Sequence, residues 1–409
     1  MTGAAPHDSG AGSATSAAPP IRPTIAGFAA TRLVGNLFVR FPYVFIDQIA
    51  RGLGVDVHTL TVVFGVRELG GVVSPVAGRW VDRGHCGRVI AVGGTLAGVS
   101  CLLAATAWFP LFVLVMVLGG ATKVSVDLAQ NAWVGHAVPL SARGRVIGLI
   151  EATWAGAFLV GVPALGWAVD RWGWQAAFVI TGPALAVAAT LSGGRLRDPL
   201  QPIDDNPTGL VDSESMVHHV RVDARPDRVT AAVWVFAFAQ PFAQMLIFAV
   251  YATWFRNEIG LSNGRISLIT ALLGVAELVG TVITVLSTDR LGPIRCGMWG
   301  MGLTIPPILG VVAVGESTVA AAALLIVMAV AIEFAFVSVL PVVSELDVTS
   351  RGKAVARVFV LIMVSRAVGS AVSGTVYDIG GFDATLGTAA LAAAVASGAL
   401  WWSRRGVRS

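Results

Sequence analysis

Long apolar segments separated by short polar connections run through the whole chain. Each segment is roughly 20 residues long, which is the length that an α-helix needs to cross the hydrocarbon core of a bilayer. The pattern therefore indicates an all-α membrane protein. It predicts twelve transmembrane helices, over residues 25–49, 56–80, 89–107, 110–136, 146–169, 174–192, 229–255, 264–287, 296–314, 318–343, 354–376 and 384–402.

The composition supports this expectation. Of the 409 residues, 55% are hydrophobic and only 13% are charged, and the mean hydropathy is +0.77. An average soluble domain has about 25% charged residues, so this chain carries too little charge to cover a surface exposed to water. The formal net charge of +4 rests almost wholly on arginine, because Lys123 and Lys353 are the only lysines. In a membrane protein such charge indicates loop topology, and we expect no binding to nucleic acid.

Motifs for catalysis or for a bound cofactor are missing from the sequence. Cys86, Cys101 and Cys296 show no metal-ligand spacing, and the six histidines are scattered. There is no phosphate-binding loop and no nucleophile beside a general base. We therefore expect no enzyme activity, no catalytic residues, no metal and no cofactor.

Three polar stretches flank and divide the apolar segments. Residues 1–24 are predicted to be a disordered tail, residues 193–228 a flexible linker, and residues 403–409 a second tail. Arg and Lys concentrate in the linker, in the second tail and in every second connection, such as the one with Arg83 and Arg88. The positive-inside rule then places the linker and both termini in the cytoplasm.

The chain repeats itself over two groups of six segments. Residues 65–71 read GVRELGG and residues 274–280 read GVAELVG, 209 positions later, and the fifth and eleventh segments match at an offset of 208. Six helices return a chain to the same side of the membrane, so the two halves, residues 25–192 and 229–402, are expected to have the same orientation. Parallel repeats of this kind are typical of transporters whose two halves rock about a central site.

A motif in the connection after the second segment gives the repeat a family resemblance. Residues 78–88 read GRWVDRGHCGR, and residues 289–292, in the equivalent connection of the second half, read DRLG. These stretches resemble the signature of the major facilitator superfamily, and the resemblance extends over nearly the whole chain. It implies twelve helices in two parallel six-helix halves. It also implies a cytoplasmic latch between the halves, formed by Gly78, Asp82, Arg83, Arg88, Asp289 and Arg290.

The fifth segment is similar to a narrower group within the superfamily. Gly156, Gly161, Pro163 and Gly166 resemble the Gly-Pro motif of the superfamily's drug–proton antiporters, which implies export. A valine separates Gly161 from Pro163. The antiporters' motif in the fourth segment, an Arg ahead of a Gly, is absent from this sequence.

Polar residues inside the bilayer are costly, and they usually face a cavity that contains water. In the first, fourth and seventh segments they recur mostly at spacings of three or four, which puts them on one face of each helix, and the tenth segment offers only Glu333. The resemblance implies that these four helices line the central cavity. The candidates for substrate binding there are Arg32, Asn36, Arg40, Lys123, Asn131, Gln240, Gln244 and Glu333.

Depth along the helices indicates which charges meet. At 1.5 Å per residue, Arg32 and Asp127 lie roughly 10 and 13 Å from the cytoplasmic ends of their segments, so we expect them to pair. Arg40 and Lys123 lie roughly 20 Å up and are expected to contact an acidic group of the substrate, while Asp127 exchanges between Arg32 and a proton. The alternative is that these charges only pair with one another and tie the helices together.

Two carboxylates belong to the repeat itself, because Glu68 recurs as Glu277. Both are interpreted as pairing or gating groups beside the cavity. Arg67 corresponds to Ala276 and so occurs in one half only. Adjacent residues of a helix point about 100° apart, so Arg67 and Glu68 are not expected simply to neutralise each other.

Three further residues are cavity candidates of second rank: Glu151, Trp154 and Arg366. Arg366 corresponds to Phe158 in the first half, so it also breaks the repeat. The candidates for proton coupling are then Asp127, Glu68, Glu151 and Glu277.

These observations favour a secondary transporter in the cell membrane, which moves a small-molecule substrate through the lipid bilayer as a monomer. Proton-coupled efflux is the leading hypothesis. A proton-coupled importer of an organic anion or metabolite is one alternative. A membrane sensor or scaffold with the same fold and no transport cycle is another.

Overall fold

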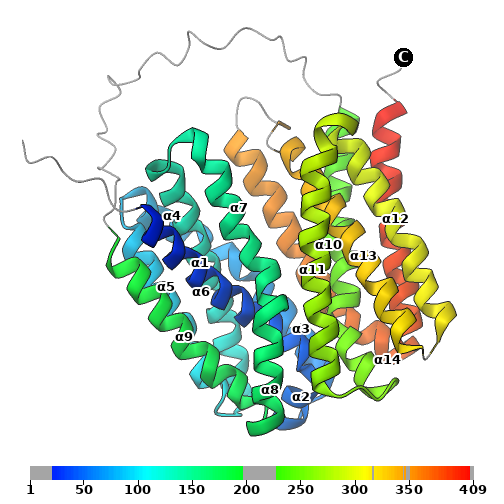
Figure 1. Ribbon diagram of the computed structural model, residues 1–409, viewed down its shortest axis with the longest axis horizontal. Coiled ribbons are helices and arrows are strands. Elements are labelled where there is room, and N and C mark those ends of the chain that lie inside the picture. The colour runs from blue at the N-terminus through cyan, green and yellow to red at the C-terminus, as the bar shows by residue number, and fades with distance from the viewer. Residues whose placement is uncertain (1–20, 197–226, 316, 344, 347–350, 406–409) are drawn as a thin grey trace, which may run out of the picture.

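The computed structural model describes residues 21–196, 227–315, 317–343, 345–346 and 351–405. Within these ranges the chain forms helices and no strands, which confirms the predicted all-α class (Figure 1). Its elements are α1 (Ile21–Val44), α2 (Ile46–Leu53), α3 (Val57–Glu68), the 3₁₀ helix η1 (Leu69–Val73), α4 (Ser74–Asp82), α5 (Cys86–Ala104), α6 (Phe109–Ala137), α7 (Leu140–Gly156), the π-helix η2 (Ala157–Gly161), α8 (Val162–Trp172), α9 (Gln175–Gly194), α10 (Asp227–Asn257), α11 (Asn263–Leu291), α12 (Pro293–Val314), α13 (Thr318–Val343) and α14 (Arg351–Arg405).

Ten of these helical segments are long and apolar enough to cross a membrane, counted over the described residues. The last of them, residues 357–404, contains two helices, because Gly380 and Gly381 have non-helical backbone angles. The first helix, α1, does not count among the ten; it carries Arg32 and Arg40 in its middle. The total of twelve spans stays a prediction.

The ends of the halves differ slightly from the sequence-based boundaries. Helix α1 begins at Ile21, four residues before the expected start, and α10 begins at Asp227. Most of the predicted tails and linker lie outside the described residues, so these domain boundaries stay predictions.

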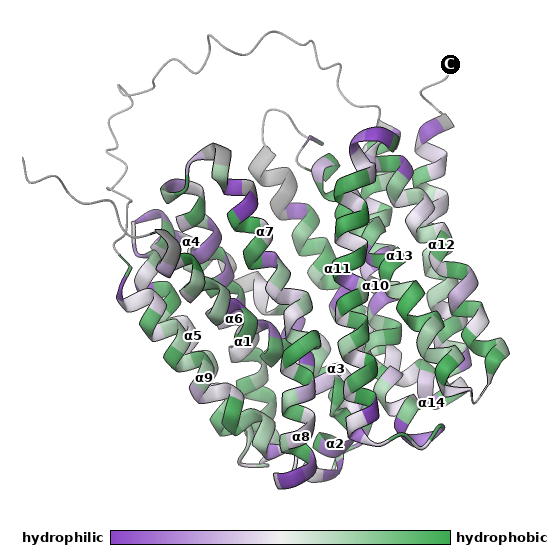
Figure 2. Ribbon diagram, viewed as in Figure 1, coloured by the Kyte–Doolittle hydropathy of each residue, from purple (hydrophilic) through white to green (hydrophobic). Residues whose placement is uncertain are grey.

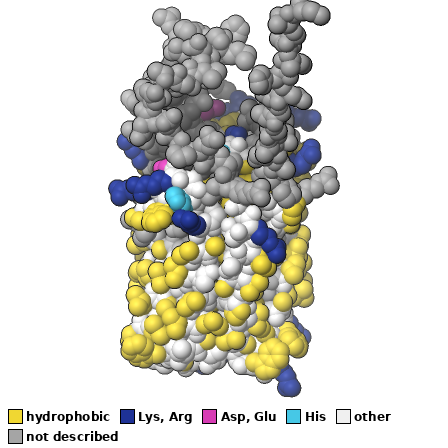
Figure 3. All heavy atoms as spheres, turned by 90° about the vertical axis from the view of Figure 1, so that its left-hand side faces the viewer, with side chains coloured by type: hydrophobic (Ala, Val, Ile, Leu, Met, Phe, Trp, Pro, Cys, Tyr) yellow, Lys and Arg dark blue, Asp and Glu magenta, His cyan; other side chains and the backbone are white. Residues whose placement is uncertain are grey.

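The outer walls of the helices are apolar. Figure 2 shows hydrophilic residues concentrated toward the two ends of the helices, and Figure 3 shows hydrophobic side chains over one wall with Lys and Arg gathered near its upper end. Exposed large hydrophobics include Leu114, Val160, Val285 and Leu286, each with more than half of its surface accessible. A protein in water would bury these side chains, whereas a lipid bilayer solvates them.

The fifth predicted segment is interrupted by a π-helix. Pro163 has no backbone N–H and cannot donate to the carbonyl four residues earlier, and the turn before it widens into η2. Wide turns of this type often occur at functional sites. Trp154 lies one turn before η2, and its carbonyl oxygen accepts a hydrogen bond from Arg40 Nη1 at 2.9 Å.

The repeated GV-x-EL stretch forms the contact between the halves. A Cβ on Gly65 in α3 would lie 2.5 Å from the carbonyl oxygen of Ala367 in α14. A Cβ on Gly274, the equivalent residue in α11, would lie 2.8 Å from the carbonyl oxygen of Ala155 in α7. Both contacts are too close for any side chain, so glycine at this repeated position allows the two backbones to approach.

At one end of the bundle a polar network joins the halves. Asp47 in α2 accepts hydrogen bonds from three residues at the end of α10: Thr253 at 3.0 Å, Arg256 at 2.6 Å and Asn257 at 3.2 Å. Asn263 at the start of α11 donates to Asp170 of α8 at 2.5 Å. This end carries the connections that are poor in Arg and Lys. At the opposite end, no ion pair joins the halves among the residues that the structure describes.

Candidate functional site

Arg32 of α1 is the centre of a first charge cluster. Its guanidinium lies 3.0 Å from Asp127 Oδ1, so the predicted pair is present. It also lies 2.5 Å from Glu151 Oε1, and Asp127 in turn pairs with Lys123 at 2.5 Å, one helical turn earlier on α6. Only Glu151 is largely exposed, with 54% of its side chain accessible. Four of the predicted site residues therefore form one neutral cluster.

Arg40 lies two turns further along α1 and pairs across the two halves. Its Nη1 and Nη2 atoms donate to the two carboxylate oxygens of Glu277 in α11, at 2.8 and 2.5 Å. Both side chains are buried, at 6% and 3% exposure. The guanidinium also stacks on the ring of Phe158, 3.3 Å from its centroid. In this conformation Arg40 and Lys123 each have a carboxylate of the protein as partner, so their predicted contact with a substrate acid requires one of these pairs to break.

Glu68 joins a third cluster. Its Oε2 accepts from Arg366 Nε of α14 at 2.9 Å, and its Oε1 accepts from Arg67 Nη2 at 3.0 Å. Arg67 and Glu68 form an ion pair, but they do not simply neutralise each other, because Glu68 is shared with Arg366.

Trp154 lies where cations from the two halves converge. The centroid of its ring is 4.4 Å from Arg40 Cζ, 5.8 Å from Lys123 Nζ and 5.8 Å from Arg366 Cζ. All four residues were candidates from the sequence, and the structure brings them together. Each contact lies within the range at which an aromatic face attracts a cation.

Glu333 of α13 is the central carboxyl that has no ion pair with any described residue. Its Oε1 atom lies 3.5 Å from Thr281 Oγ1 in α11. The same hydroxyl lies 3.1 Å from the backbone carbonyl of Glu277, one turn earlier. Asp127, Glu151, Glu68 and Glu277 all contact arginine or lysine, so Glu333 is set apart from the other four.

The remaining cavity candidates are more scattered. Asn36 is buried and donates to Thr153 Oγ1 at 3.2 Å. Gln240 is 1% exposed, and neither of its amide atoms has a partner among the described residues, whereas Gln244 is half-buried. Asn131 is exposed on the same face of α6 as Asp127. No contact places these residues in one of the three charge clusters.

The predicted latch residues lie at helix ends. Gly78 is in α4, and the charged members of the latch are exposed at the ends of α4, α5 and α11; they are Asp82, Arg83, Arg88, Asp289 and Arg290. No ion pair with a described residue of the other half is present. Their role as a latch stays a prediction.

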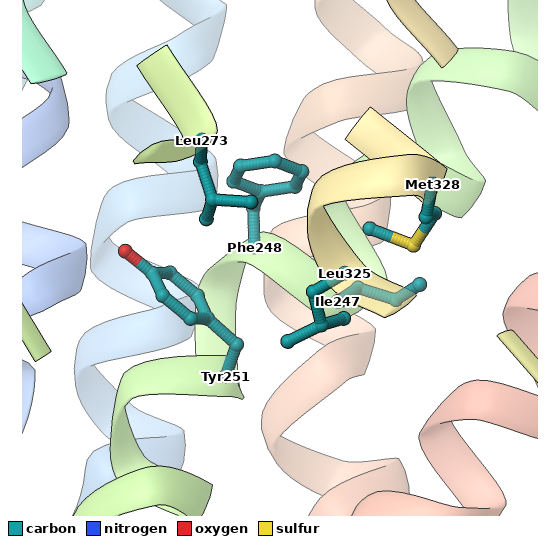
Figure 4. Close-up of a pocket in the computed structure, with 6 residues that line it drawn as sticks. All are labelled: Ile247, Phe248, Tyr251, Leu273, Leu325 and Met328. Carbon is teal, nitrogen blue, oxygen red and sulfur yellow. The ribbon is translucent and has the colours of Figure 1, made fainter. Parts of the chain in front are cut away.

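A small apolar pocket lies in the second half between α10, α11 and α13 (Figure 4). It is lined by Ile247, Phe248, Tyr251, Leu273, Leu325 and Met328. Its empty volume of about 160 Å³ includes space open to solvent, so the enclosed part is smaller still. The pocket is therefore too small to hold an organic solute. In the part of the chain that the structure describes, no cluster of metal-ligating side chains is present.

Sequence reasoning missed two groups. The first is the network of Asp47 with Arg256 and Asn263, which joins the halves at one end. The second is Phe158, whose ring lies against Arg40. A signal for Phe158 existed, because it is the repeat partner of Arg366. For the network a partial signal existed, because Asp47 falls on the polar face of the first segment, but its partners lie in other helices that only the fold brings close.

A protein-family model described as Major Facilitator Superfamily matches residues 26–346 of the chain. Among curated proteins, Multidrug resistance protein 2 of Bacillus subtilis (strain 168) is 24% identical over 240 residues. The match spans 58% of this chain and 58% of that protein, so it covers little more than half of either.

Several solved transporters share the fold. A bacterial homologue of the human lysosomal transporter Spinster, in an inward-facing and occupied conformation, superposes with a TM-score of 0.73 over 95% of this chain and 97% of that one, at 13% identity. The nucleoside transporter NupG gives 0.70 over 93% and 99%, at 12% identity. A D-xylose–proton symporter gives 0.69 over 91% and 96%, at 14% identity. At these identities the likeness shows the fold alone.

Proposed function

Because the chain belongs to the Major Facilitator Superfamily, whose solved neighbours are transporters and not enzymes, we propose that it exports a small organic solute in exchange for protons. It would act as a monomer in the cell membrane, by alternating access, with both termini in the cytoplasm. The observation that carries the exchange is the isolated carboxyl of Glu333. The similarity to a multidrug resistance protein of Bacillus subtilis supports the outward direction.

The contacts between the halves support an inward-facing conformation. The halves are joined by Asp47 and Arg256 at the end whose connections are poor in Arg and Lys. The positive-inside rule places that end outside the cell. The other end, with exposed Glu151 and Asn131, then faces the cytoplasm, from which a solute to be exported enters.

Exchange requires the proton and the solute to compete for one group. A carboxylate held by arginine gains little from a proton, because protonation breaks its ion pair. Glu333 has no such pair, so a proton and a basic nitrogen of the solute can each neutralise it, and neither can bind while the other is there. Competition of this kind couples inward proton movement to outward solute movement, and it favours a solute with a basic nitrogen.

The test is transport in inside-out vesicles, following dissipation of an imposed pH gradient across a panel of organic cations, organic acids and lipophilic drugs. Wild-type protein should release protons from the vesicles when an organic cation is added. Glu333→Gln should abolish this release. Asp378→Asn, the same chemical change at an exposed carboxyl, should not alter it. Full proton release by Glu333→Gln would rule out the exchange proposed here.

A second candidate function is proton-coupled uptake of an organic anion, favoured by the cations around Trp154. A proton on Asp127 would free Lys123 to bind an anion, so proton and anion would bind together and move in the same direction. An organic acid loaded inside the vesicles, rather than a cation added outside, would then leave together with protons and dissipate the gradient, and Asp127→Asn would remove the effect. A sensor or scaffold without a transport cycle would give no response to any compound.

A further inference from the structure

The cluster around Glu68 carries one more positive charge than negative. Arg67 and Arg366 share this one carboxylate, each bound to a different oxygen. The other two clusters have no such excess, since Arg32 and Lys123 meet Asp127 and Glu151, and Arg40 meets Glu277. An unbalanced cation in the interior of a membrane protein is costly, and the unpaired carboxyl of Glu333 contacts Thr281 rather than either of these arginines.

Arg67 carries the unbalanced charge. Its side chain is 1% exposed, and its Nε and Nη1 atoms are buried with no hydrogen-bond partner among the described residues. The rings of Tyr43 and Phe64 lie 5.3 and 5.2 Å from its Cζ atom. These aromatic faces offset part of the positive charge, but they do not replace oxygen acceptors for the two N–H groups. Buried donors of a guanidinium are seldom left unpaired in native proteins.

The repeat shows that this excess of positive charge occurs at only one of the two equivalent contacts between the halves, the seam between α3 and α14. Arg67 stands where the second half has Ala276, and Arg366 stands where the first half has Phe158. Arg67 and Arg366, neither of which has a cationic counterpart in the other half, therefore both bind Glu68. Glu68 itself does have a counterpart, Glu277. At the equivalent carboxylate, Glu277, a single arginine makes a balanced two-bond pair.

We propose that Arg67 and Arg366 form a binding site for a small monovalent anion, either a chloride ion or a carboxylate group, at the seam between α3 and α14. The anion accepts from the unpartnered edge of Arg67 and neutralises the cluster. Arg366 is 18% exposed and lies beside Trp154, so it connects the site to the central charge clusters. The site does not depend on the direction or the coupling proposed above.

The test is a thermal-unfolding titration of the purified full-length protein in detergent. Sodium chloride and sodium acetate are each compared with sodium sulfate at matched ionic strength, and binding of radiolabelled chloride is measured in parallel. Wild-type protein should show a saturable rise in Tm with chloride. If acetate or benzoate displaces the chloride, the site also takes the carboxylate of a solute; if neither does, it is an inorganic-ion site. Both results support the proposal.

Three variants separate this site from a general effect of salt. Arg67→Ala and Arg366→Phe, each of which installs the residue of the other half, leave one arginine with one carboxylate and should abolish chloride binding. Glu68→Gln removes the competing carboxylate and should tighten chloride binding several-fold. Arg51→Ala, at an exposed arginine, is the control and should change nothing. The proposal is overturned if chloride and sulfate act alike on wild-type protein, or if both repeat-restoring variants bind chloride as wild type does.

Discussion

The pair between Arg40 and Glu277 is the most buried ion pair joining the halves, and its removal gives a sharp test of what burial contributes. Glu277→Gln keeps the shape of the side chain and removes its charge. The guanidinium of Arg40, 6% exposed, then has no carboxylate partner. Removing one partner of a buried pair typically costs about 3–5 kcal/mol, so we expect a loss of this size in the free energy of unfolding.

The chain offers a matched control at the same contact distance. Glu151 lies 2.5 Å from Arg32, as Glu277 Oε1 lies 2.5 Å from Arg40, but its carboxyl is 54% exposed. Arg32 also keeps Asp127 when Glu151 is lost. Because an exposed pair is screened by water, Glu151→Gln should cost less than about 1 kcal/mol.

The measurement is equilibrium unfolding in mixed micelles, completed by the double variant Arg40→Met with Glu277→Leu. Replacing both members of a buried pair by apolar side chains is often close to neutral. The double variant should therefore be more stable than Glu277→Gln alone. The reasoning is refuted if Glu277→Gln costs no more than Glu151→Gln. It is also refuted if the double variant is no more stable than Glu277→Gln.

Two further predictions concern the seam and a helix cap. Gly65→Ala places a Cβ 2.5 Å from the carbonyl oxygen of Ala367, so the free energy of unfolding should fall by about 1–3 kcal/mol; Gly264→Ala, with open space around it, should show no such loss in the same unfolding assay. Asp56 caps α3 by accepting a hydrogen bond from Thr59 N at 2.5 Å, and hydrogen bonds from the side chain and the backbone of Thr59 lower the pKa of its carboxyl. A lowered pKa means that the stabilisation is present above the ordinary pKa of an aspartate and is lost as the pH falls through the lower, folded-state value. Asp56→Ala should cost about 1 kcal/mol near neutral pH and progressively less in acid, and an equal loss of Tm at all pH values would contradict this account.

Local information was sufficient for part of the charge arrangement. Arg32 and Asp127 lie in the same half at similar depths, so counting residues along two helices was enough to pair them. The partner of Arg40 could not be found in this way, because Glu277 belongs to the other half and residue counts do not give the position of one half relative to the other. Periodicity gives the face of a helix and its depth, but the relative position of two halves depends on the conformation.

The π-helix shows a second limit of the sequence. The apolar run of residues 146–169 continues through Pro163, so this segment was expected to be one helix. Whether such a proline kinks a helix or widens a turn depends on what receives the displaced carbonyls. Here the turn widens, and the backbone N–H of Val162 bonds to the carbonyl of Ala157, five residues earlier.

The position of Arg32 and Arg40 on one helix has a mechanical consequence. They are eight residues apart, about 12 Å along α1, and on the same face. Arg32 belongs to the cluster that includes exposed Glu151, and Arg40 ties the first half to α11. A movement of α1 at the Arg32 cluster would be carried along one stiff helix to the pair at Arg40. The two clusters would then move together without a relay of side chains between them.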